Sequence, residues 1–274
     1  MEAEASRSAE ALERAVGFFR RRTLFVALAA AVLLVLNGAI GSLLGFDLPA
    51  ALHDLPGGIV WMFSNFMPTV ASFSKLGTIV SQLASTVLVS VAASCTAAVL
   101  ALLLAVIGSR SVGLGGPVPL AVRAVASLLR NIPTVAWALL LLLSFRQSEF
   151  TGYLALFLGS LGYLTRCFLE SIDEVSGGAV EALRATGATY GQLVAQAVMP
   201  LSATAVVSWV LFMIETNVRD ATLVGILTGT GIGFVFDLYY KSFRYDNAGL
   251  VVLAVVVVVI ALELTSNLVR RAIL

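Results

Sequence analysis

The sequence predicts an all-α membrane protein with six transmembrane helices and both termini in the cytoplasm. Of its 274 residues, 59% are hydrophobic and only 12% are charged, about half the charge of an ordinary soluble domain. Several apolar runs approach or exceed the roughly 20 residues that a helix needs to cross about 30 Å of hydrocarbon. Lys and Arg are also unevenly shared between alternate connecting segments, which is typical of a multi-pass protein.

Composition also narrows the functional classes. The net charge of +1 gives no electrostatic reason to expect nucleic-acid binding. His53 is the only histidine, and Cys95 and Cys167 lie in apolar runs without metal-ligand spacing. The sequence has no Ser/His/Asp, Cys/His or metal constellation, so we expect no catalytic residues, no metal, no cofactor and no enzymatic activity.

The N-terminal segment, residues 1–22, is predicted to be an amphipathic helix on the cytoplasmic membrane surface. Apolar residues recur there at helical spacing, opposite acidic and basic ones, and Arg20–Arg22 would lie at the headgroups. A frayed tail is the alternative. The transmembrane domain is assigned to residues 23–274. Its first apolar run is longer than the apolar region of a signal peptide, which favours a retained anchor.

Six spans follow from the apolar runs. They cover residues 24–46, 76–107, 131–145, 150–169, 201–225 and 248–269. The stretch from Asp47 to Lys75, which contains Pro49, Pro56 and Gly57, is expected to be an outer loop.

The distribution of basic residues sets the orientation. With the N-terminus inside, the cytoplasmic segments contain eleven Lys and Arg residues and the outer loops contain four, with Arg130 and Arg219 set aside. Because cytoplasmic loops are enriched in Lys and Arg, both termini are expected inside. The segment 170–200 then faces the cytoplasm.

That segment has the composition of a docking surface for a soluble partner. It is polar and lies between two long apolar runs, with Glu181 and Ala182 followed by Gly187 and then Pro200. Alanines would present a helix face with little bulk, and Gly187 would allow a sharp bend between two short helices. Pro200 would begin the next span, where its missing N–H has no cost. An ordinary amphipathic loop is the alternative.

The fifth span ends in polar residues, Glu215, Asn217, Arg219 and Asp220. Ionisable groups at membrane depth are costly and usually face a pathway or one another. Arg219 and Asn217 could line the route of an anionic solute. Alternatively, Glu215 and Arg219 form an internal ion pair, since they are four residues apart on one helix face.

The 170–200 segment resembles the coupling motif of ABC importer permeases, Glu-Ala-Ala, x3, Gly, x9, Ile-x-Leu-Pro. Glu181, Ala182, Gly187 and Pro200 match in kind and spacing. The other three positions carry apolar substitutions, which are Leu183, Ala197 and Met199.

A second resemblance is to phosphonate/phosphite-type permeases, and it covers roughly residues 75–270. Those permeases have a similar Glu-x-Asn-x-Arg block, here Glu215 to Arg219, followed by Ala-Thr-x-x-Gly and a glycine-rich turn. Arg130 and Pro133 resemble the Arg-x-x-Pro opening of their third span. Asp220 departs from the pattern by adding a negative charge.

The resemblance implies the type I ABC importer permease fold and a multi-pass protein of the inner membrane. Such a subunit forms a translocation pathway as a homodimer by alternating access, for phosphonates, phosphite or phosphate. Its partners would be two cytoplasmic ATPase subunits, an extracytoplasmic solute-binding protein, a second copy of itself and membrane lipid. Glu181, Ala182, Gly187 and Pro200 would couple to the ATPase. The four polar residues of the fifth span would line or gate the pathway.

Other functions stay open at this point. A methionine- or osmoprotectant-type ABC permease shares the coupling motif. An ATP-independent channel or secondary transporter would need no coupling segment.

Overall fold

The computed structural model describes the backbone of residues 2–273 and the side chains of residues 17–272. The chain divides into two units, Met1–Ser64 and Asn65–Leu274. All regular elements among the described residues are helical. The prediction of an all-α chain is confirmed.

The first unit contains α1 (Glu2–Leu43) and most of α2 (Leu48–Phe66). Residues Gly17–Leu43 of α1 are long and apolar enough to cross a membrane. The predicted amphipathic face of residues 1–22 lies mostly outside the described side chains and stays a prediction. The segment expected as an outer loop is helical over α2, and Asp47 caps this helix by accepting from the Ala50 N–H at 3.1 Å.

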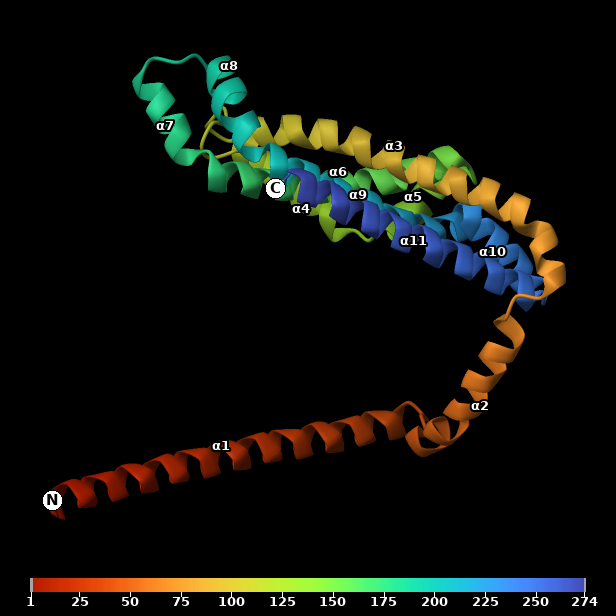
Figure 1. The fold of residues 1–274 in the computed structure, drawn as a ribbon, viewed down its shortest axis with the longest axis horizontal. Coiled ribbons are helices and arrows are strands. Elements are labelled where there is room, and N and C mark those ends of the chain that lie inside the picture. The colour runs from red at the N-terminus through yellow and green to blue at the C-terminus, as the bar shows by residue number, and fades with distance from the viewer. Residues whose placement is uncertain (1, 274) are drawn as a thin grey trace. The chain divides into compact units, whose positions relative to one another are not determined.

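The second unit is a helical bundle (Figure 1). A 3₁₀ turn (Val70–Lys75) leads into α3 (Leu76–Gly108), followed by α4 (Val118–Asn131), α5 (Thr134–Phe145) and α6 (Glu149–Val175). Two short helices, α7 (Gly177–Ala185) and α8 (Tyr190–Leu193), and a π-turn (Val194–Val198) come next. The chain ends with α9 (Met199–Thr228), α10 (Gly231–Lys241) and α11 (Tyr245–Ile273).

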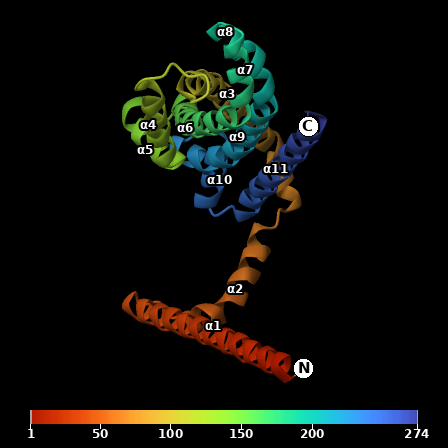
Figure 2. The ribbon, with the colours of Figure 1, turned by 90° about the vertical axis from the view of Figure 1, so that its left-hand side faces the viewer.

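Small residues hold the centre of the bundle together. Ala93, Ala97, Ala101 and Ala105 lie four residues apart on one face of α3 and are fully buried, and α3 packs most extensively against α6. Apolar helices gain little from association in lipid unless their backbones approach closely, which small residues permit. Figure 2 shows α4 and α5 on one side of α6, with α11 on the other side of the bundle.

The third predicted span, residues 131–145, corresponds to α5 alone. Helix α4 precedes it and ends at Asn131, α5 begins at Thr134, and the two helices are bent by 89° against each other. Pro133 explains the break, because the residue before a proline avoids the helical region, and Ile132 is extended at φ −92° and ψ 119°. Five described helices can each cross a membrane, and the bent pair makes six if it forms one span.

Close backbone contact supports this break. A Cβ atom added to Gly162 of α6 would lie 2.6 Å from the backbone nitrogen of Arg130 and 2.7 Å from the Leu129 Cβ. Only glycine therefore allows α6 to lie against the end of α4. Across the break, the indole N–H of Trp137 on α5 donates to the Leu129 carbonyl at 3.3 Å, which satisfies one carbonyl that the helix end leaves open.

We expect Gly162→Ala to destabilise the protein by about 1–3 kcal/mol, because the added methyl group overpacks a backbone contact. Thermal unfolding in detergent would measure the effect. Gly77→Ala is the matched control, since Gly77 lies in helix α3 with open space around it. Equal melting temperatures for the two variants would contradict the packing argument.

Candidate functional site

The segment between α6 and α9 forms a hairpin that extends beyond one end of the bundle (Figure 1). We call residues 177–198 the hairpin; it consists of α7, α8 and the π-turn. Its inner side is apolar, because Val180, Leu193 and Ala197 are buried in the main core cluster. Glu181 and Ala182 are exposed on its outer side. The hairpin is thus anchored on one face and open to a partner on the other.

The bend lies at Gly187, where the sequence predicts it. Gly187 has φ 81°, which glycine adopts without the steric cost of a side chain. The Gly187 N–H donates to the Arg184 carbonyl at 3.0 Å and the Ala188 N–H to the Leu183 carbonyl at 3.2 Å. These two bonds form a Schellman motif, which ends α7 and turns the chain toward α8.

Pro200 lies in the first turn of α9. The helix does not restart there, since residues Tyr190–Thr228 form one continuous stretch. In the π-turn before it, hydrogen bonds join residues five apart instead of four, as in the bond from the Met199 N–H to the Val194 carbonyl. Such a turn accommodates a proline that would break a regular helical ladder. The hairpin is therefore connected to α9 without a flexible joint.

A polar junction around Asp173 fixes the hairpin to the rest of the bundle. The Asp173 carboxylate accepts from the backbone N–H of Arg110 at 2.7 Å and from the Arg123 guanidinium of α4 at 2.8 Å. Both side chains of the ion pair are about four-fifths buried, at 22% and 19% exposure. Arg184 of α7 donates to the Ser111 carbonyl at 3.0 Å in the same loop. The junction joins α4, α6, α7 and the α3–α4 loop.

A cleft of about 220 Å³ opens beside the break between α4 and α5. It lies between that break, α6 and α9. Asp220 lines it and accepts from the Thr134 hydroxyl at 3.1 Å. Its other lining residues include Arg130, Pro133, Tyr163, Thr216 and Asn217.

Asn217 joins three helices. Its side-chain amide donates to Ser94 of α3 at 2.8 Å and to Ser160 of α6 at 2.7 Å, and Ser90 donates to its backbone carbonyl at 3.2 Å. The residue is buried at 2% exposure. Asn217 therefore fixes α9 in the bundle at the point where α9 borders the cleft.

Glu215 and Arg219 form an ion pair at 2.9 Å with side chains 13% and 47% exposed. Neither residue lines the cleft. Arg219 directly precedes Asp220, and the side chains of adjacent helical residues point about 100° apart around the helix axis. The structure thus brings Asn217 and Asp220 to the cleft and leaves the ion pair on another face. Sequence reasoning missed Tyr163 and Thr216 as cleft residues, and the only signal for Arg130 was the Arg-x-x-Pro pattern.

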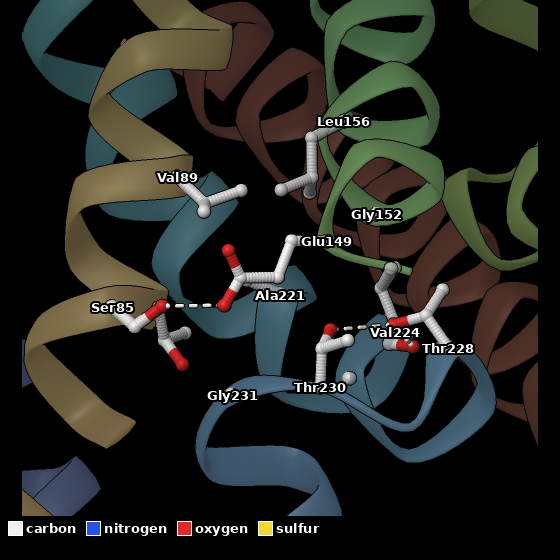
Figure 3. Close-up of a pocket in the computed structure, with 12 residues that line it drawn as sticks. Ser85, Val89, Glu149, Gly152, Leu156, Ala221, Val224, Thr228, Thr230 and Gly231 are labelled. Atoms are coloured by element: carbon white, nitrogen blue, oxygen red, sulfur yellow. Dashed lines mark hydrogen bonds between the residues drawn. The ribbon is translucent and has the colours of Figure 1, made fainter. Parts of the chain in front are cut away.

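A second cavity, drawn in Figure 3, lies where α6 begins and α9 ends, which is the end of the bundle away from the hairpin. There the Ser85 hydroxyl donates to Glu149 at 3.1 Å, and the hydroxyls of Thr228 and Thr230 lie 2.9 Å apart. Its volume of about 20 Å³ is comparable to the space that one water needs. It is too small to hold a solute.

Comparison with known proteins fits this arrangement. The family model for binding-protein-dependent transport system inner membrane components matches residues 97–273. The phosphate-import permease protein PhnE of Mycolicibacterium smegmatis is 27% identical over 223 residues, covering 81% of this chain and 42% of that protein. The phosphite transport system permease protein PtxC of Stutzerimonas stutzeri is 27% identical over 228 residues, covering 82% and 81%. The chain thus spans less than half the length of the first relative and about four-fifths of the second.

Solved structures share the fold. The inward-facing MetNI methionine ABC transporter matches with a TM-score of 0.67 at 19% identity, covering 73% of this chain and 98% of that one. A bacterial ABC transporter for alginate import matches with a TM-score of 0.58 at 15% identity, covering 86% and 96%. The expected type I ABC importer permease fold is confirmed. With its membrane-spanning helices and a family match over most of its length, the chain belongs to the binding-protein-dependent transport system inner membrane components and is a multi-pass membrane protein.

Proposed function

We propose that this chain is the permease subunit of an ATP-driven ABC importer for phosphonates or related phosphorus oxyanions, such as phosphite and phosphate. The observation that carries the proposal is the hairpin with the coupling motif, anchored on its inner side and exposed at Glu181 and Ala182. The named functions of the two relatives support the solute class. ATP hydrolysis is assigned to two separate subunits, and solute delivery to an extracytoplasmic binding protein.

Orientation follows from the basic residues. The eleven-to-four distribution of Lys and Arg favours cytoplasmic termini and a cytoplasmic hairpin. Glu181, Ala182, Gly187 and Pro200 would then contact or position the ATPase subunits. The shallow alanine face at Ala182 and Ala185 lets a partner surface approach closely.

Two rigid connections could carry movement from the hairpin to the pathway. One is the continuous helical stretch Tyr190–Thr228, which runs from the hairpin past Asn217 and Asp220. The other is the Asp173 junction, which links Arg184 of α7 through the α3–α4 loop to α4 and the break. Closure of the ATPase pair would thus move both walls of the cleft, and alternating access requires that ATP favours one of two states.

The pathway is proposed to run between two copies of this chain. Asn217 and Asp220 line the cleft, while the Glu215–Arg219 pair is available on another face of α9. Arg219 retains 47% exposure, so a second protomer or the passing solute could contact it. In this arrangement all four polar residues of α9 border the route or its gate.

The test is ATPase activity and uptake in proteoliposomes that contain the permease, its ATPase and its binding protein. Phosphite, phosphate and methylphosphonate should stimulate both activities, and L-methionine and glycine betaine should not. Stimulation by methionine or betaine alone would favour those permease types. Uptake that persists without the ATPase would favour a channel or secondary transporter.

Substitutions in the hairpin should uncouple transport. Glu181→Lys reverses a charge on the exposed face, and Gly187→Val is strained at φ 81°. We expect each to lower solute-stimulated ATPase activity by about tenfold, which corresponds to about 1.4 kcal/mol. Gly77→Ala, in open space on α3, is the control outside the hairpin. Normal coupled uptake in both hairpin variants would refute its role.

Disruption of the Asp173 junction should lower the uptake per ATP hydrolysed more than it lowers the rate of ATP hydrolysis. Arg123→Gln leaves a partly buried carboxylate without its charged partner, at a cost of about 1–3 kcal/mol. We expect uptake per ATP hydrolysed to fall several-fold, while Arg123→Lys, which keeps the charge, retains most of it. If uptake and hydrolysis fall in the same proportion, the junction only stabilises the fold.

A further inference from the structure

The cleft beside the helix break combines one unpaired cation with one carboxylate. Arg130 lies in the last turn of α4, and among the described residues no hydrogen bond or ion pair engages its guanidinium. Asp220 lies across the cleft on α9 and accepts one hydrogen bond, from Thr134. The cleft volume of about 220 Å³ far exceeds the roughly 30 Å³ that one water occupies in the liquid. A small hydrated anion fits this space.

The donors at the cleft suit an oxyanion. Guanidinium offers up to five N–H donors in a planar fork that matches phosphate geometry. Helix α5 also begins at this cleft without a side-chain cap, and helix N-termini favour anions.

Asp220 is unfavourable for an anion unless that anion carries a proton. An ionised carboxylate only accepts hydrogen bonds, and it has about four lone-pair positions. The Thr134 hydroxyl uses one of them. A phosphate-type group loses its second proton with a pKa of about 6, so near that pH a large fraction still has a P–OH donor. Sulfate is a full dianion and has none.

We propose that the cleft is a transient site for protonated phosphorus oxyanions, in which Arg130 donates to oxygens of the solute and Asp220 accepts from its P–OH group. Asp220 then discriminates against sulfate, because two unprotonated oxyanions would face each other. This selection rests on the proposed function and adds to any selection by the binding protein. Arg130, rather than the Glu215-paired Arg219, is the cation that meets the solute in this cleft.

Binding to the permease itself tests the proposal. The full chain with its ATPase subunits, in nanodiscs at pH 6.5 without the binding protein, is titrated with phosphite by saturation-transfer ³¹P NMR. Sulfate and phosphate are then added, in separate titrations, as competitors of phosphite. Phosphite should bind the wild type, and sulfate should displace it at least about tenfold less effectively than phosphate does, because sulfate cannot donate the charge-assisted hydrogen bond to Asp220.

Variants of Arg130 and Asp220 should change binding in different ways. Arg130→Gln should weaken phosphite binding by about tenfold. Asp220→Asn should retain phosphite binding but let sulfate compete, because an amide can donate to sulfate. Asp220→Ser serves the same purpose if the asparagine variant does not assemble. Arg146→Gln and Glu263→Gln are the controls. They remove one positive and one negative charge at exposed positions away from the cleft, and they should leave the affinities for phosphite and sulfate unchanged.

Three results would overturn the site. They are no phosphite binding to the wild type, unchanged affinity in Arg130→Gln, or unchanged sulfate exclusion in both Asp220 variants. The uptake assay separates this from the proposed function. A wild-type importer that takes up phosphite while the cleft variants bind normally leaves the function intact and refutes the site. A wild-type importer that takes up no phosphorus oxyanion refutes the proposed function itself.

Discussion

An interrupted helix is costly inside a bilayer, and the break between Asn131 and Thr134 is the constraint around which the bundle is arranged. Backbone groups freed from a helix need partners where lipid offers none. Here α6 comes into backbone contact at Gly162, and Trp137 donates to the Leu129 carbonyl. Thr134 in turn donates to Asp220 of α9. The same contacts that make the break tolerable also bring polar side chains to one place.

The proposed function requires that the hairpin be connected mechanically to that break. Small residues on α3 and α6 let the central helices pack closely, whereas an ion pair and a bond to a backbone carbonyl join the hairpin to the bundle. Asp173 of α6 contacts both the α3–α4 loop and Arg123 of α4, so it joins three segments, and Arg184 adds α7 through the Ser111 carbonyl. A displacement at the hairpin would be transmitted by stiff elements, since packed cores have discrete arrangements and deform little.

Much of this architecture could be predicted from the sequence. The apolar runs located five spans, and Gly187 ends its helix as its place in the coupling motif predicted. Three features escaped prediction because local pattern does not encode them. Pro56 and Gly57 favour a loop in the sequence, yet both lie inside helix α2, which Asp47 caps. Helix α4, bent by 89° against α5, precedes the predicted third span and contains Arg123 and Arg130, so no apolar run marks it. The cleft depends on how far α4, α6 and α9 approach one another, which spacing along the chain does not reveal.

The π-turn at Val194–Val198 fixes the rotation of α9 relative to the hairpin. One residue more than a regular turn advances every later side chain by about 100° around the helix axis. Shortening the turn by one residue would leave the hairpin and the length of α9 nearly intact, yet turn Asn217 away from Ser94 and Ser160 and carry Asp220 off the cleft. Insertions and deletions at this turn would thus change which α9 side chains line the cleft without altering the fold.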